Sequence, residues 1–157
     1  MVKRFLSANA SDILSMNAQE LKQSIKASEG RIICSEVIGN MQPIIGDITN
    51  AEVAVSYGAD LILMNGFDCY HPHINGLTDV PAEELVTTVR DYTGRPIGIN
   101  LEPVDNTADL LEQRIEIPKG RACSVETLSL AENLGLDFIC LTGNPGTGVT
   151  NKSIVEA

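Results

Sequence analysis

Three carboxylates stand where apolar runs of the sequence end. Glu36 lies near the end of the first such run, Asp68 shortly after the second, and Glu102 directly after the third. Carboxylate oxygens are the ligands that Mg²⁺ and Mn²⁺ prefer, and a carboxyl group beside such an ion can move protons. We therefore predict that Glu36, Asp68 and Glu102 are catalytic residues and ligands of a divalent metal ion.

Two histidines follow the same run as Asp68. His71 and His73 flank Pro72, and in an extended segment residues two apart point to the same side. Imidazole pairs of this kind bind transition metals in some hydrolases. His71 and His73 are therefore further candidate metal ligands, and solvent-facing histidines in a loop are the alternative.

A glycine-rich loop near the end of the chain could bind a phosphate or another anion. The segment GNPGTGVTN precedes a predicted helix, so backbone N–H groups would gather at the positive end of the helix dipole. It matches neither the Walker pattern nor GxGxxG. Three cations, Arg114, Lys119 and Arg121, lie in the long polar segment before it. The predicted anion-binding residues are Gly143, Asn144, Gly146, Gly148, Lys119 and Arg121.

The elements that must position these side chains alternate along the chain. The apolar, β-branched runs predict strands, and capping residues with glycine stops predict helices. In the helix at 18–28, Asn17 and Glu20 have the spacing of a capping box. We expect strands at 31–38, 61–65, 96–101 and 138–142, and helices at 10–15, 18–28, 49–57, 81–92, 125–134 and from 152.

Strands that alternate with helices predict an α/β fold with a parallel sheet of four βα units. Segments 54–66 and 129–143 both run from a helix through glycine and aspartate into a strand, which indicates a repeated unit. We expect the N-terminal half of a TIM (β/α)8 barrel, and a doubly wound open sheet is the alternative. In both architectures, ligands bind at the carboxyl ends of the strands, where the candidate residues lie.

The chain is expected to form a single partial-barrel domain over 1–157, with N-terminal helices in 1–30 and the βα units in 31–157. A full barrel needs roughly 250 residues, and the sequence ends inside a predicted helix, which indicates truncation at the C-terminus. Half a barrel leaves two strand edges uncovered. We therefore expect a homo-oligomer or the missing C-terminal half of the same chain to cover them, and we expect the 157-residue piece alone to be inactive.

Charge and cysteine content restrict the partners and the compartment. The chain has 21 acidic and 11 basic residues and a net charge of −10, which disfavours nucleic acid and anionic membranes as partners. It contains no run of about 18 apolar residues and no signal-peptide pattern. The four cysteines are widely spaced, which fits a reduced, cytoplasmic setting. Cys34 and Cys140 lie in apolar strands and are interpreted as packing residues.

The segments NGFDCYHPHINGL, PIGINLEP and LTGNPGTGVTNKSI together resemble an uncharacterised bacterial family of TIM-barrel proteins. Its members are often labelled haloacid dehalogenase-like hydrolases or likened to phosphoenolpyruvate phosphonomutase. The family is longer than this chain, so the resemblance implies that the chain is the N-terminal part of the barrel. The DxDx(T/V) loop of haloacid dehalogenase phosphatases and the KxCGH loop of the phosphonomutase relatives do not occur in the sequence.

These observations lead to three functional hypotheses. The first is a barrel enzyme that performs metal-assisted lyase or isomerase chemistry on a small phosphorylated or carboxylated metabolite, with Mg²⁺ or Mn²⁺ as cofactor. The second is a hydrolase in which His71 and His73 bind a transition metal. The third is a non-catalytic regulatory barrel that binds a small anionic ligand.

Overall fold

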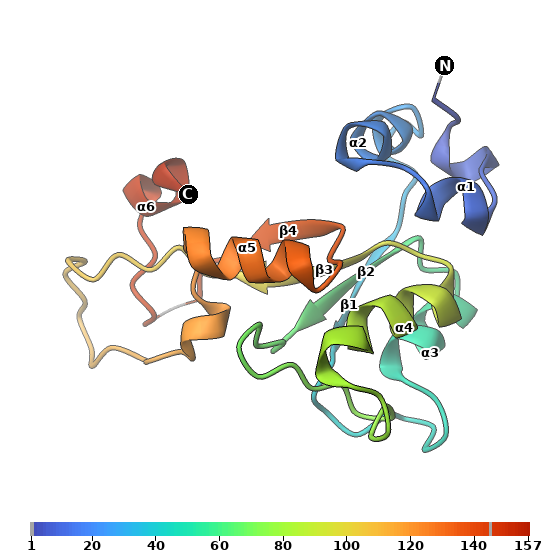
Figure 1. Cartoon of the computed structure of the whole chain (residues 1–157). Coiled ribbons are helices and arrows are strands. Elements are labelled where there is room, and N and C mark those ends of the chain that lie inside the picture. Colours follow the sequence, from blue (N-terminus) through green and yellow to red (C-terminus); the bar gives the residue numbers. More distant parts are fainter. Residues whose placement is uncertain (1, 145) are drawn as a thin grey trace.

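Four parallel strands form the sheet, and each strand pairs with the one that follows it in the chain (Figure 1). A computed structural model describes residues 2–144 and 146–157, so Pro145 of the predicted anion-binding loop lies outside the described residues. A doubly wound sheet reverses its strand order at a switch point. The order β1-β2-β3-β4 has no such reversal within the described residues, and it is that of the first half of a (β/α)8 barrel. The strands are β1 (Cys34–Ile38), β2 (Leu61–Asn65), β3 (Ile97–Leu101) and β4 (Phe138–Leu141).

The helices begin at the capping residues that the sequence predicts. Asn17 and Thr49 each accept hydrogen bonds from the first turn of the helix that follows, and Glu20 and Glu52 complete the two capping boxes. None of the helices in the described residues is long and apolar enough to cross a membrane. The α-helices are α1 (Ala10–Leu14), α2 (Ala18–Lys26), α3 (Asn50–Ser56), α4 (Leu85–Thr93), α5 (Val125–Asn133) and α6 (Asn151–Glu156), and the 3₁₀ turns are η1 (Phe5–Ser7), η2 (Ala82–Glu84) and η3 (Lys119–Arg121).

Some element boundaries differ from the predicted ones. The first strand begins at Cys34 rather than at residue 31. Pairing with β2 starts only at the Ile33 carbonyl, which accepts hydrogen bonds from the N–H groups of Asp60 and Leu61. The helix predicted at 81–92 begins as η2, where the Glu84 N–H bonds to the Pro81 carbonyl three residues back, and continues as α4. The last strand ends at Leu141, one residue early.

The main core lies between the sheet and helices α3, α4 and α5. Ile62, Ile97 and Ile99 point to this side and are fully buried, together with Val86 and Val89 of α4. Because side chains alternate along a strand, the residues between them point to the other face. We call this the inner face: it carries Cys34, Glu36 and Ile38 of β1, Leu61 and Leu63 of β2, Gly98 and Asn100 of β3, and Phe138 and Cys140 of β4.

The N-terminal helices cover the inner face only where the strands begin. Phe5, Ile13 and Leu21 pack there with Leu61 of β2, and Phe138 of β4 borders this cluster. Phe138 lies directly against Gly98, where any Cβ atom would collide with the aromatic ring. In Figure 1, α1 and α2 lie at the end where the strands start, and α6 lies beyond the end where they finish. The carboxyl ends of the strands are therefore left to the loops.

The internal repeat seen in the sequence has a structural counterpart. Asp60, just before β2, donates its N–H to the Ile33 carbonyl at 2.8 Å and accepts the Ile33 N–H on Oδ2 at 2.9 Å. Asp137, just before β4, makes the same two bonds to Ile97 at 2.8 and 2.9 Å. Asp60 thus fixes the start of β1, and Asp137 fixes the start of β3. We call each of these two-bond contacts an aspartate clasp.

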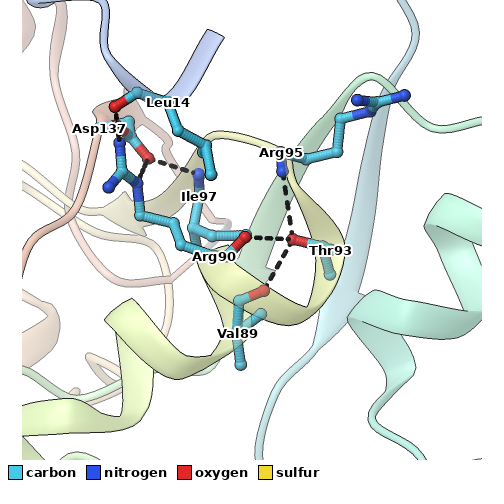
Figure 2. A network of polar contacts seen from close by, with 7 residues as sticks. All are labelled: Leu14, Val89, Arg90, Thr93, Arg95, Ile97 and Asp137. Atoms are coloured by element: carbon cyan, nitrogen blue, oxygen red, sulfur yellow. Dashed lines mark hydrogen bonds and ion pairs between the residues drawn. The ribbon is translucent and has the colours of Figure 1, made fainter. Parts of the chain in front are cut away.

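The second clasp belongs to a wider polar network (Figure 2). Arg90 of α4 forms a two-point ion pair with Asp137, at 2.8 and 2.9 Å, and donates to the Leu14 carbonyl of α1 at 3.2 Å. Thr93 bonds back to the Val89 carbonyl and accepts the Arg95 N–H. The network joins α1, α4, β3 and the start of β4 at the amino end of the sheet.

Candidate functional site

Glu102 is the buried carboxylate at the carboxyl end of the sheet, with 1% of its surface exposed. Its carboxylate accepts hydrogen bonds from Thr147 Oγ1 at 2.7 Å, from Asn144 Nδ2 at 2.7 Å and from the Asn144 N–H at 3.4 Å. Arg121 Nη2 lies 3.8 Å from the same group. Both donor residues belong to the glycine-rich loop, so Glu102 fixes the conformation of that loop.

The glycine-rich loop also packs against the long segment that follows β3. The Asp105 N–H bonds to the Gly148 carbonyl at 2.9 Å, and the Ile115 N–H bonds to the Gly146 carbonyl at 2.8 Å. The Asn144 N–H, which was predicted to face an anion, is directed at Glu102. The proposed anion-binding role of Gly143, Asn144, Gly146 and Gly148 therefore stays a prediction.

The three cations of the long segment have different surroundings. Arg114 donates to the backbone carbonyls of Thr147 and Asp105 at 2.7 and 3.1 Å, so it ties the two loops together. Lys119 pairs with Glu126 at 2.9 Å and lies over the Tyr70 ring, and the hydrogen bond with Glu126 raises the pKa of Lys119. Arg121 lies beside Glu102, so it is the predicted cation that contacts the end of β3.

Asp68 shapes its own loop. Its Oδ1 accepts the N–H groups of Tyr70 at 2.8 Å and His71 at 3.3 Å, which is the geometry of an Asx turn. The Asp68 side chain also lies directly against Gly120, where a Cβ atom would collide with it. The loop that carries Asp68 is thus held against η3, while His71 and His73 are exposed beyond it.

The predicted metal ligands do not meet in one group. Among residues 2–144 and 146–157, no cluster of three or more histidine, cysteine, aspartate or glutamate side chains could hold a metal ion. The Glu102 carboxylate accepts hydrogen bonds from the glycine-rich loop, and the Asp68 carboxylate accepts those of its own turn. Glu36, Asp68 and Glu102 therefore do not fit a three-carboxylate metal centre. The metal roles of Glu36, Asp68, Glu102, His71 and His73, and Mg²⁺ or Mn²⁺ as cofactor, stay predictions.

Asn100 is a residue for which the sequence predicted no catalytic, metal-binding or anion-binding role. It lies on the inner face of β3, is 9% exposed, and donates from Nδ2 to Glu36 Oε1 of β1 at 3.4 Å. Its Oδ1 is buried and accepts no hydrogen bond from the described protein atoms. An unsatisfied buried acceptor costs about 1–3 kcal/mol, so this atom is a place where a ligand donor would be favoured.

The alternation in β3 is the signal that could have identified Asn100. Ile97, Ile99 and Leu101 are apolar and point to the helices, whereas the intervening inner-face positions are occupied by Gly98 and Asn100. A polar residue at an inner-face position of a central strand is unusual unless something binds it.

Glu36 is exposed because β1 is an edge strand. The hydrogen bond from Asn100 spans β2, which brings side chains of β1 and β3 together above Leu63. Cys34, which was interpreted as a packing residue, is exposed on this face, so that interpretation is wrong for Cys34. Partial burial, together with the nearby Cys140 and Glu36, raises the Cys34 pKa. We call Glu36 and Asn100, together with Arg121 beside Glu102 at the end of β3, the candidate site.

Comparison with known proteins gives one match. The model of a family described as Domain of unknown function (DUF7916) matches residues 6–157. The searches of curated proteins and of solved structures returned no match. Because the family model covers nearly the whole sequence, the chain belongs to the DUF7916 family.

Proposed function

We propose that this chain is a domain of an enzyme that acts on a small carboxylated or phosphorylated metabolite. The substrate would bind on the inner face at the carboxyl ends of the strands, where barrel enzymes place their active sites. The observation that supports this most directly is the orphaned Asn100 Oδ1, buried beside the exposed carboxylate of Glu36.

The side chains present suit proton transfer to and from a bound anion. Asn100 would accept a hydrogen bond from a hydroxyl or amino group of the substrate and orient it. Glu36, held by Asn100 Nδ2, would remove or return a proton at a carbon next to a carboxylate, the step shared by many lyases and isomerases. Arg121 would offset the charge of the anionic group.

Ligand binding can be tested by nuclear magnetic resonance. Oxalate, malate, pyruvate and glycerol phosphate are titrated while the side-chain amide signals of Asn100 are followed. We expect at least one of them to shift these signals, and we expect Asn100→Ala to weaken its binding about tenfold, as loss of one buried hydrogen bond implies. The exposed Asn106→Ala is the matched control. Equal affinity in Asn100→Ala and the wild type would exclude Asn100 from the site.

Proton transfer has a separate readout. In deuterated water, bound malate should exchange a hydrogen on a carbon next to its carboxylates for deuterium, and Glu36→Gln should abolish this exchange while malate still binds. Exchange that persists in Glu36→Gln would rule out Glu36 as the base. Binding without any exchange in the wild type would contradict the catalytic part of the proposal and favour a regulatory ligand-binding domain.

A further inference from the structure

Both outer strands of the sheet have an unpaired edge. Within residues 2–144 and 146–157, β1 pairs only with β2, and β4 pairs only with β3. The Ile33 carbonyl and the Gly39 N–H bond towards β2, so by alternation the backbone groups of Cys34 and Glu36 and the Ile38 N–H point away from the sheet. The Ile38 carbonyl already accepts hydrogen bonds from the Met41 N–H and Asn50 Nδ2. An open edge of this kind is a ready template for another strand.

The two edges are complementary to each other. All four strands are parallel and follow one another in order, so a twofold axis along the strand direction places β4 of one copy beside β1 of a second copy in parallel orientation. The same operation places β4 of the second copy beside β1 of the first, so no edge remains. Four strands from each copy make eight, the number at which an α/β barrel closes around a filled interior.

The outer surface shows the same complementarity. A mainly apolar groove runs beside β1 and α3. It is lined by Val37, Ile38, Met41, Ile44, Val53 and Ala54, with Gln42 and Asn50 as its polar members. In a βα barrel, the helix that follows a strand covers the junction with the next strand. Here α6 follows β4, buries none of its own residues, and exposes Ile154 and Val155. In the closed arrangement, α6 of one copy would cover the junction between its own β4 and β1 of the second copy. The groove beside β1 lies at this junction.

We propose that two copies of this chain associate edge to edge, β4 against β1, to close an eight-stranded barrel, with α6 of each copy in the groove of the other. The interface is isologous and closes on itself, as in most homodimers. The association also encloses the exposed inner face of β1, so β4 of the other copy would lie beside Glu36. This inference goes beyond the proposed function and does not depend on it.

Light scattering coupled to size-exclusion chromatography tests the association. We expect a mass twice the 16.8 kDa of one chain. Val155→Glu on α6 and Ile44→Glu in the groove should each raise the dimer dissociation constant at least tenfold, because each places a charge in an apolar contact. Both side chains are 85% exposed in the single chain, so the substitutions leave its core intact. Val125→Glu at the start of α5 is the matched control, because Val125 is 84% exposed and belongs neither to α6 nor to the lining of the groove.

Amide hydrogen exchange locates the interface. The amides of Cys34, Glu36 and Ile38 should be protected in the wild-type dimer and exchange rapidly in monomeric Val155→Glu. A monomeric wild type at about 100 μM, a concentration at which specific homodimers are populated, would overturn the proposal and leave the edges to another chain. Open-ended oligomers, unprotected β1 amides, or an equal effect of Val125→Glu would each overturn it as well.

Discussion

Each end of the sheet contains a carboxylate that has several hydrogen-bond partners. The two ends differ in whether a buried polar atom nearby is left without a hydrogen bond. At the amino end, Asp137 binds Arg90 at two points and the Ile97 N–H, and short turns join helix to strand. At the carboxyl end, Glu102 holds a long loop in place, while the neighbouring Asn100 keeps a buried oxygen without a partner. The polar groups of the Asp137 network are paired with one another, whereas Asn100 Oδ1 accepts no hydrogen bond from the described residues. Variants at the two ends therefore test stability and the proposed ligand binding separately.

The largest effect is expected at the amino end. Asp137→Ala should lower the free energy of unfolding by about 3 kcal/mol, because it removes the ion pair of the largely buried Arg90 and the acceptor of the Ile97 N–H. Asp60→Ala removes the other clasp, which has no arginine partner among the described contacts, and should cost about 1 kcal/mol. Urea denaturation measures both. Equal costs for the two variants would show that Arg90 adds nothing to the clasp.

An intermediate effect is expected at Glu102. Glu102→Ala should lower the free energy of unfolding by about 2 kcal/mol, since Asn144 and Thr147 lose their acceptor. Amide exchange in residues 143–149 should rise with it, because the loop is released. If that exchange stays as slow as in the wild type, the contacts between the glycine-rich loop and residues 105–115 hold the loop without Glu102.

The smallest effect on stability is expected at Asn100, with the largest effect on binding. Asn100→Leu replaces an unsatisfied buried amide by an apolar side chain of similar size, so the free energy of unfolding should stay unchanged or rise by up to about 1 kcal/mol. Ligand binding should be lost in the same variant. A loss of stability above about 2 kcal/mol would mean that the hydrogen bond to Glu36 holds the sheet together.

The sequence predicted the central elements better than the outer ones. The predicted bounds of β2 are those observed, because both of its faces are buried and the apolar run ends where the burial ends. β1 was predicted three residues too long, since the apolar residues Ile32 and Ile33 lie before the paired part of an edge strand. The parallel order was predicted from the alternation of helices and strands, and the pairing confirms it.

The candidate residues lie at the carboxyl end of the sheet, as the sequence predicted, but the relations between them differ from the predicted ones. Glu36, Asp68 and Glu102 were expected to form one group because each follows a strand. Local chemistry separates them: Asp68 accepts the N–H groups two and three residues ahead, and Glu102 accepts donors more than forty residues ahead. The first bond could be read from an Asx pattern. The second depends on how two loops fold back on each other, which residue spacing does not encode.

The aspartate clasps have a consequence for the order in which the chain folds during its synthesis. One clasp fixes Ile33, the residue just before β1, from Asp60, 27 positions later. The other fixes Ile97, the first residue of β3, from Asp137, 40 positions later. On a ribosome, β1 would stay unanchored until Asp60 emerges, and β3 until Asp137 emerges. The sheet would therefore form as two successive strand pairs, β1 with β2 and then β3 with β4, which the ladder between β2 and β3 afterwards joins.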